Sequence, residues 1–199
     1  MSDHYYTQKP GVKHDRRMHE AVLRGQKYRF ATDAGVFSKA GVDYGSQVLI
    51  ESITLNASAA VLDVGCGYGP IGIAAASLVP QGSVTMIDIN ERAVELAKEN
   101  AALNGVRNAT VIHSDLFEAV KDRKFDVILT NPPIRAGKST VHQIFEEGWS
   151  LLNPGGEMWV VIQKKQGAPS ALAKLETLFE RIEEVTKDKG YRIYRAVKQ

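Results

Sequence analysis

Short apolar runs alternate with segments of helical spacing from Ala59 to the end of the chain, and this alternation limits the fold more than any other property. Parallel strands need long crossover connections, which helices supply, so the pattern predicts a mostly parallel sheet with helices on both faces. The last two apolar runs flank Lys187–Gly190 and predict an antiparallel hairpin. We therefore expect an α/β fold with a doubly wound, mostly parallel, seven-stranded sheet.

Apolar periodicity and cap residues place the individual elements. Asn90 is a good N-cap for a helix over Glu91–Leu103, and Asp43 is one for a helix over Tyr44–Leu55. Further predicted helices span Val141–Leu152 and Ser170–Phe179. The predicted strands are Ala60–Val64, Val84–Ile87, Ala109–Ile112, Phe125–Thr130, Glu157–Gln163, Arg181–Thr186 and Arg192–Val197.

The composition is that of an ordinary soluble protein. The 199 residues suffice for one domain over residues 1–199, with 44% hydrophobic and 24% charged residues. The one cysteine, Cys66, excludes an internal disulfide framework and a cysteine-built zinc site, so we expect no metal. Residues 1–11 lack the apolar core of a signal peptide, and Ile71–Val79 is too short to cross a membrane. We expect a cytoplasmic protein without a membrane partner.

The amino-terminal segment differs from the rest of the chain in charge. The first 30 residues hold seven Lys or Arg and three Asp or Glu, so their charge is +4, and the remainder carries −2 of the net +2. Within Leu23–Phe30 a glycine turn and alternating basic and aromatic residues predict a short hairpin. We expect residues 1–42 to form a basic extension, as an appendage to an α/β core over residues 43–199.

Polar residues follow each of the first four core strands. In an open parallel sheet the ligand crevice lies beyond the carboxyl ends of the strands, where the strand order reverses. Those positions hold Asp63–Gly69, Asp88, Ser114–Leu116 and Asn131–Pro133. We expect these four groups to meet along one edge of the sheet.

The glycine loop Gly65–Gly69 lets the backbone turn sharply and approach a ligand closely. Asp88 follows at the distance at which a carboxylate accepts hydrogen bonds from ribose hydroxyls. Pro70 occupies a position where the dinucleotide fingerprint needs glycine or alanine, which disfavours a nicotinamide cofactor. Taken singly, a tight turn and a helix-capping Asp explain these features equally well, but together they favour an adenosine-containing ligand.

Asn131-Pro132-Pro133 is the most specific motif. The two prolines fix an extended backbone, and the residue before a proline is kept out of the helical region. The Asn131 side-chain oxygen and the Pro132 carbonyl then both face the crevice as acceptors. Such a pair suits an amino group on a conjugated system, because hydrogen bonds to its N–H groups would localise its lone pair. The alternative is a turn with a capping asparagine.

These motifs resemble those of the class I S-adenosylmethionine-dependent methyltransferases across nearly the whole chain. The segments Gly35–Ser38, Asp43, Gly45-Ser46 and Trp159–Gly167 are similar to the small methyltransferase-domain family, which includes the catalytic halves of bacterial ribosomal-RNA guanine-N2 methyltransferases. The resemblance implies a Rossmann-like fold with S-adenosyl-L-methionine as the cofactor. It also implies roles for single residues. Gly65, Gly67 and Gly69 would wrap the methionine part, Asp63 would help to hold its amino group, Asp88 would bind the ribose, Asp115 and Leu116 would hold the adenine, and Asn131 with Pro132 and Pro133 would form the catalytic loop.

The predicted function is methyl transfer to an exocyclic amino group of a base in RNA, with guanine N2 of ribosomal RNA favoured. The family often has an aromatic residue after the second proline, where this chain has Ile134, so the motif does not secure guanine. Glutamine-amide methyltransferases of release factors share Asn-Pro-Pro, usually with a tyrosine next. Methylation of a glutamine in a translation factor is therefore one alternative, and a non-catalytic nucleotide-binding or RNA-binding module is another.

The expected RNA surface surrounds the catalytic loop. Arg135 and Lys138 immediately follow Asn-Pro-Pro, and Lys164-Lys165 and the amino-terminal extension add further basic residues. We expect Ile134, Arg135 and Lys138 to contact the substrate. A chain of this size has little room for a separate RNA-reading domain, so substrate choice is left to the hairpin, a partner or a homodimer. His113, His142 and Cys66 receive no catalytic role.

Overall fold

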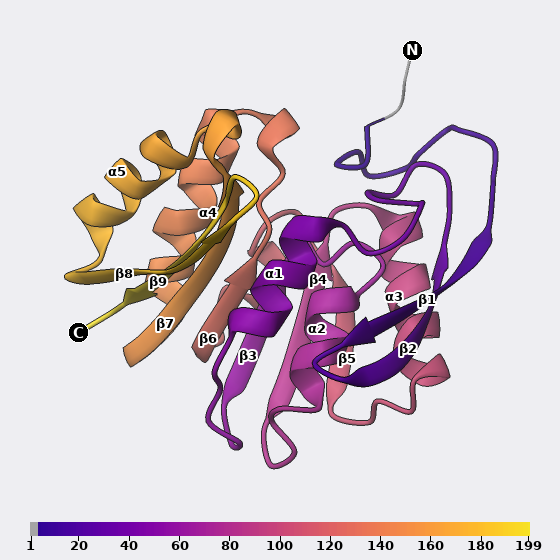
Figure 1. Cartoon of the computed structure of the whole chain (residues 1–199), viewed down its shortest axis with the longest axis horizontal. Coiled ribbons are helices and arrows are strands. Elements are labelled where there is room, and N and C mark those ends of the chain that lie inside the picture. Colours follow the sequence, from indigo (N-terminus) through magenta and orange to yellow (C-terminus); the bar gives the residue numbers. More distant parts are fainter. Residues whose placement is uncertain (1–3) are drawn as a thin grey trace.

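The computed structural model describes residues 4–199, and its main element is a seven-stranded sheet of strand order β5-β4-β3-β6-β7-β9-β8 (Figure 1). A two-stranded sheet, β1-β2, lies beside it. Within residues 4–199 none of the helices is both long and apolar enough to cross a membrane. In chain order the strands and α-helices are β1 (Arg17–Leu23), β2 (Gln26–Thr32), α1 (Tyr44–Ser52), β3 (Ala60–Val64), α2 (Pro70–Ala76), β4 (Ser83–Asp88), α3 (Glu91–Leu103), β5 (Ala109–His113), β6 (Phe125–Thr130), α4 (Lys138–Leu151), β7 (Leu152–Gln163), α5 (Ala168–Leu178), β8 (Arg181–Asp188) and β9 (Tyr191–Val197).

The large sheet is doubly wound, as the alternation predicts. Strands β3 to β7 are parallel, whereas β9 pairs antiparallel with both β7 and β8. The chain runs outward from β3 to β4 and β5 and then returns to the other side of β3 with β6, so the order reverses between β3 and β6. That reversal opens a crevice at the carboxyl ends of these two strands.

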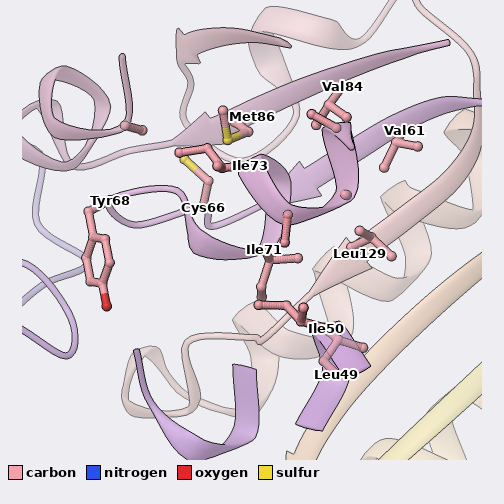
Figure 2. Packing of buried hydrophobic residues seen from close by; sticks show 14 of the residues in the cluster. Leu49, Ile50, Val61, Cys66, Tyr68, Ile71, Ile73, Val84, Met86 and Leu129 are labelled. Atoms are coloured by element: carbon pink, nitrogen blue, oxygen red, sulfur yellow. The ribbon is translucent and has the colours of Figure 1, made fainter. Parts of the chain in front are cut away.

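The apolar residues form two clusters, one on each face of the sheet. The first contains the inner faces of α1, α2 and α3, and Figure 2 shows Ile50, Ile71 and Ile73 of α1 and α2 within it. The second is built from α4 and α5 with the opposite faces of the same strands, among them Leu62 and Ile128. Strands buried on both faces have near-continuous apolar sequences, which is why short apolar runs identified them.

The predicted elements agree with the structure except at a few ends. Helix α1 ends at Ser52 rather than Leu55, because Ile53 takes an extended conformation. Strand β7 begins at Leu152, five residues before the predicted start, because Leu152 pairs with Phe125 of β6. Gly155 and Gly156 then exchange backbone hydrogen bonds with Lys198 at 2.7 and 2.9 Å. Asn153-Pro154-Gly155-Gly156 resembles a turn in sequence, so this pairing depends on a partner far along the chain.

The amino-terminal hairpin is packed more closely than the appendage that the sequence suggested. It extends from Arg17 to Thr32, and the side chains of Leu23, Tyr28 and Phe30 are buried in the first apolar cluster. The buried Asn100 side chain of α3 accepts from the Ala31 N–H at 2.7 Å and donates to its carbonyl at 3.0 Å. The apolar side chains of β2 are buried against α3, so the hairpin is packed onto the core.

Candidate active site

A cavity of about 360 Å³ opens at the carboxyl ends of β3, β4, β5 and β6, where the strand order reverses. Its volume lies in the usual range for small-molecule sites. Residues from all four strand ends line it, as the sequence predicts. The sequence-predicted site residues that the cavity brings together are Gly65, Gly67, Asp88, Asp115, Leu116, Asn131, Pro132 and Pro133.

Asp88 holds the glycine loop in place. Its two carboxylate oxygens accept from the backbone N–H groups of Gly67 and Asn90, each at 2.8 Å. Gly65 and Gly67 have φ values of +70° and +56°, and a Cβ added at either would meet nothing within 4 Å. The loop backbone is therefore open to a ligand, and a carboxylate oxygen can accept further hydrogen bonds. Burial raises the pKa of Asp88 to about 6.

Asp63 lies behind the loop with one oxygen unpaired. Its Oδ2 accepts from the Gly72 N–H of α2 at 2.9 Å, while Oδ1 has no hydrogen-bond partner in the described part of the chain. The side chain is fully buried, and burial raises its pKa to about 7. Gly72 is needed because a Cβ there would lie 2.4 Å from the Met86 sulfur. A buried carboxylate with a free oxygen suits a cationic ligand group.

Gly69 and Pro70 shape the start of α2. Gly69 has φ +105°, and a Cβ on it would lie 2.9 Å from Ile73 Cδ1. Pro70 occupies the first turn, where its missing N–H costs nothing. Gly69 is absent from the cavity lining, so the structure gives it a packing role, and its contact with a cofactor remains a prediction.

Ser114 fixes the loop after β5. Its hydroxyl donates to the Leu116 carbonyl at 2.7 Å and accepts from the Ala119 N–H at 3.0 Å. Leu116 has φ +48°, a left-handed conformation that is strained for leucine. Strain of this kind persists where the surroundings enforce it, and here it holds an apolar side chain against the cavity next to the exposed Asp115.

Asn131 is oriented by Asp43, the N-cap of α1, and by Ser46 within that helix. Its amide nitrogen donates to Asp43 Oδ2 at 3.2 Å and to the Ser46 hydroxyl at 3.1 Å. Asp43 also caps α1 by accepting from the Ser46 N–H at 3.0 Å. A carboxylate can only accept, so it determines which end of the amide is the nitrogen. The Asn131 oxygen is thereby left for a ligand.

Several cavity residues were missed at the level of sequence. Asp43 carried a signal as a helix cap, but its contact with Asn131 joins positions 88 residues apart. Tyr5 precedes any recognisable core element, and Phe37 belongs to the Gly35–Ser38 segment that resembles the family but received no site role. Tyr68 lies in the glycine loop with its hydroxyl buried and unpartnered within residues 4–199, and Figure 2 shows that oxygen pointing away from Cys66.

The three predicted substrate residues lie outside this cavity. Ile134 and Lys138 line a separate hollow of about 120 Å³ together with His142, whereas Arg135 is exposed on the loop between them. His142 interacts with Ser170 at 3.4 Å, and His113 with the Ile89 carbonyl at 2.9 Å. Among residues 4–199 no cluster of three His, Cys, Asp or Glu side chains is placed to hold a metal ion.

The cavity fits an adenosine-containing cation. Asp88 lines the cavity, whereas Asp63 is absent from its lining and is buried behind the glycine loop, so its contact with a cofactor stays a prediction. Burial raises the pKa of both carboxyls, and a positively charged ligand nearby would favour their ionised forms. The glycine loop is open where a methionine chain would pass, and apolar side chains such as Ile89 and Leu116 can cover an adenine ring. These observations agree with S-adenosylmethionine as the ligand.

The family model described as methyltransferase small domain matches residues 27–195. The chain belongs to this family. It is therefore a class I S-adenosylmethionine-dependent methyltransferase, and S-adenosylmethionine is its cofactor.

Curated relatives of this methyltransferase extend the comparison. The chain is 52% identical to the uncharacterized protein YbxB of Bacillus subtilis, in an alignment of 200 positions that covers 100% of both proteins. It is also 34% identical over 195 residues to the ribosomal RNA small subunit methyltransferase C of Citrobacter koseri. That alignment covers 92% of this chain and 56% of the Citrobacter protein. The chain thus spans about half the length of the ribosomal-RNA methyltransferases that it matches.

Solved structures agree with the fold of this methyltransferase. The 16S rRNA N2 G1207 methyltransferase of T. thermophilus, solved with AdoMet and guanosine, has a TM-score of 0.81 at 26% identity and covers 96% of this chain and 52% of that one. The ribosomal protein L11 methylase of Lactobacillus delbrueckii subsp. bulgaricus has a TM-score of 0.65 at 27% identity over 78% of each chain. Enzymes with an RNA and with a protein substrate share this fold.

Proposed function

We propose that this methyltransferase acts on an exocyclic amino group of a base in RNA, and that guanine N2 of ribosomal RNA is the acceptor. The observation that carries the proposal is the orientation of Asn131, whose amide nitrogen is bound by Asp43 and Ser46. Its amide oxygen and the Pro132 carbonyl are then the two acceptors that an aromatic amine requires. Similarity to ribosomal-RNA methyltransferases supports RNA as the substrate class.

The catalytic loop would bind and orient the acceptor nitrogen. The lone pair of an aromatic amine is delocalised into the ring, so the nitrogen is a weak nucleophile. Hydrogen bonds from its two N–H groups to Asn131 Oδ1 and the Pro132 carbonyl would localise that pair and direct it into the cavity. Alignment of two bound reactants contributes up to roughly 7–11 kcal/mol to lowering a barrier.

The cofactor end of the cavity would hold the methyl donor. S-adenosylmethionine supplies a methyl group on a positively charged sulfonium, which makes a covalent enzyme intermediate unnecessary. We propose that Asp63 attracts the amino group of the methionine part and that Asp88 accepts from the ribose. Gly65 and Gly67 would leave room for the chain between them.

The surface around the catalytic loop would bind the RNA backbone. Arg135 and Lys138 follow the loop, and the exposed Lys164 and Lys165 lie in the turn that leads to α5. Lys138 and Gln166 line the same hollow, so the two segments meet beside the catalytic loop. A base in a duplex must leave the stack to reach Asn131, and phosphate contacts of this kind would hold the flanking nucleotides.

A labelled-methyl assay tests the proposal. Ribosomal RNA, tRNA and release factors from cells that lack the gene are incubated with the protein and labelled S-adenosylmethionine. We expect label in ribosomal RNA and a loss of at least about 100-fold in kcat for Asn131→Ala, with binding of S-adenosylhomocysteine retained. Label in a release factor and none in RNA would instead favour a glutamine-amide methyltransferase.

A further inference from the structure

The catalytic loop of this protein does not supply a ring on which a base could stack. Ile134 follows Pro133, and its side chain packs in the second apolar cluster and lines the smaller hollow with Lys138 and Val141. It is absent from the lining of the main cavity. A stacking surface for an acceptor base beside Asn131 must therefore come from another part of the chain.

Aromatic side chains from the amino-terminal segment line the main cavity. Tyr5 and Tyr6 precede β1, and Phe37 follows β2, yet all three belong to the cavity that contains Asn131. The ring centroids of Tyr5 and Phe37 are 5.0 Å apart, and those of Tyr5 and Tyr6 are 5.4 Å apart in an edge-on arrangement. Phe37 is 41% exposed, which is unusual for so large an apolar side chain.

The backbone of Tyr5 is fixed by Asn90, the N-cap of α3. The buried Asn90 amide donates to the Tyr5 carbonyl and to the Gly35 carbonyl, each at 2.8 Å, while its oxygen caps α3 at the Ala93 N–H. Three residues later, the Gln8 carbonyl accepts from the Glu91 N–H at 2.9 Å. The segment before β1 is thus tied to the start of α3 (Figure 1).

The side chain of Tyr5 lies at the Asn131 end of the cavity. Burial raises the pKa of its hydroxyl, and among the nearby charges the Arg135 guanidinium opposes this shift while Asp43 adds to it. Asp43 binds Asn131 directly, and Arg135 follows it by four positions in the same loop. The Tyr5 hydroxyl also forms a hydrogen bond with the Arg135 backbone, so the ring lies beside the acceptor-binding loop.

We propose that Tyr5, which packs against Phe37, is the surface on which the acceptor base stacks. This inference rests on the proposed RNA function. A ring held at this position would fix the plane of the base and so direct its amino group to Asn131 and Pro132. Base–aromatic stacking tolerates any base, because every base has a π-face, so Tyr5 sets the orientation of the acceptor and not its identity.

Steady-state kinetics of three variants test the role of Tyr5, with ribosomal RNA from cells lacking the gene as the substrate. We expect Tyr5→Ala to lower kcat/KM for RNA about 10- to 100-fold and to leave S-adenosylhomocysteine affinity unchanged. Tyr5→Phe should retain near wild-type kinetics because it keeps the ring. The matched control is Gln8→Ala, which should keep wild-type kinetics, since the Gln8 side chain is exposed in the same segment and absent from the cavity lining.

A binding measurement without RNA turnover complements the kinetics. With S-adenosylhomocysteine present, we expect guanosine to quench the added indole fluorescence of Tyr5→Trp relative to the wild-type protein. Loss of S-adenosylhomocysteine affinity in Tyr5→Ala would overturn the inference and assign the ring to the cofactor. Equal kinetics of Tyr5→Ala and the wild type would overturn it as well. Absence of RNA methylation by the wild type would overturn the proposed function itself.

Discussion

Asp43 connects two tasks in one side chain. The same oxygen caps α1 through the Ser46 N–H and accepts from the Asn131 amide. The N-cap of α1 therefore also orients the Asn131 side chain. Asp43 acts through Asn131, so it is a positioning residue in the proposed reaction.

We predict that Asp43→Ser lowers kcat about 10- to 100-fold, because serine can cap the helix but is too short to reach Asn131. Asp43→Asn should stay within about threefold of the wild type, since the amide oxygen can accept both hydrogen bonds. Rates at saturating substrate and calorimetry with S-adenosylhomocysteine check this. Weaker cofactor binding in Asp43→Ser, with kcat unchanged, would contradict a positioning role.

Asp63 gives a pH-dependent prediction. Its pKa is raised to about 7, so the native protein binds more protons than the unfolded chain between the ordinary carboxyl pKa near 4 and about 7. The free energy of unfolding therefore falls as pH rises across this interval. We expect Asp63→Asn to be more stable than the wild type at pH 8 by roughly 1–4 kcal/mol and to bind S-adenosylmethionine more weakly.

Urea denaturation at pH 5 and pH 8 measures the stability difference. Calorimetry in buffers of different ionisation enthalpy measures protons released when S-adenosylmethionine binds. Binding of the cation should favour the ionised carboxylates, so affinity should increase from pH 5 to pH 8. A stability profile of Asp63→Asn parallel to that of the wild type would show that Asp63 is ionised throughout.

Helix α3 holds the amino-terminal hairpin with two asparagines one turn apart. Asn100 and Asn104 each exchange two hydrogen bonds with the backbone of β2, at Ala31 and Arg29 respectively. Asn100 is fully buried and also donates to the Tyr68 carbonyl of the glycine loop at 2.8 Å. The helix therefore links the hairpin to the glycine loop.

This pair offers a matched test at the level of elements. Asn100→Ala should lower the free energy of unfolding by about 2–4 kcal/mol, because it leaves buried backbone groups of Ala31 and Tyr68 unsatisfied. Asn104→Ala removes a similar pair of bonds at a more exposed site and should cost about 1 kcal/mol or less. Urea unfolding of both variants measures the difference. Equal decreases in the free energy of unfolding would mean that the burial of the Asn100 hydrogen bonds adds little to stability.

The elements of the core could be predicted from sequence, since buried parallel strands and helix caps leave local signals. Asn90 and Glu91–Leu103 are found where the cap and the periodicity predicted them. The edges of the cavity could not be predicted in full. The contacts of Asn131 with Asp43, and of Asn90 with Tyr5, join residues more than 80 positions apart, and no local pattern encodes such pairs.

For the whole molecule, the structure changes the meaning of the charge distribution. Several arginines of the basic extension already form ion pairs or hydrogen bonds with other groups of the protein. Arg16 pairs with Glu99 at 2.6 Å, Arg17 pairs with Asp15 at 3.1 Å, and Arg24 donates to the Ile50 and Ile53 carbonyls at the end of α1. The exposed Lys164 and Lys165, in contrast, are in the turn next to the hollow beside the catalytic loop.

We predict that Lys164→Ala/Lys165→Ala weakens RNA binding about equally for different RNA sequences, because phosphate contacts carry no sequence information. The slope of log affinity against log salt concentration should decrease by about 1–2. The control is Lys98→Ala/Lys121→Ala, which removes two exposed lysines that pair with Glu95 and Glu118. Filter binding over a range of salt measures both. An unchanged slope would place the RNA surface elsewhere.

Mass spectrometry of nucleosides is the decisive test of guanine N2 in ribosomal RNA as the acceptor. Small-subunit ribosomal RNA is purified from cells with and without the gene and digested to nucleosides, and the RNA that lacks the modification is then treated with the purified protein and S-adenosylmethionine. We predict that N2-methylguanosine decreases when the gene is absent and is restored by the wild-type protein but not by Asn131→Ala. Unchanged N2-methylguanosine in both comparisons would contradict it.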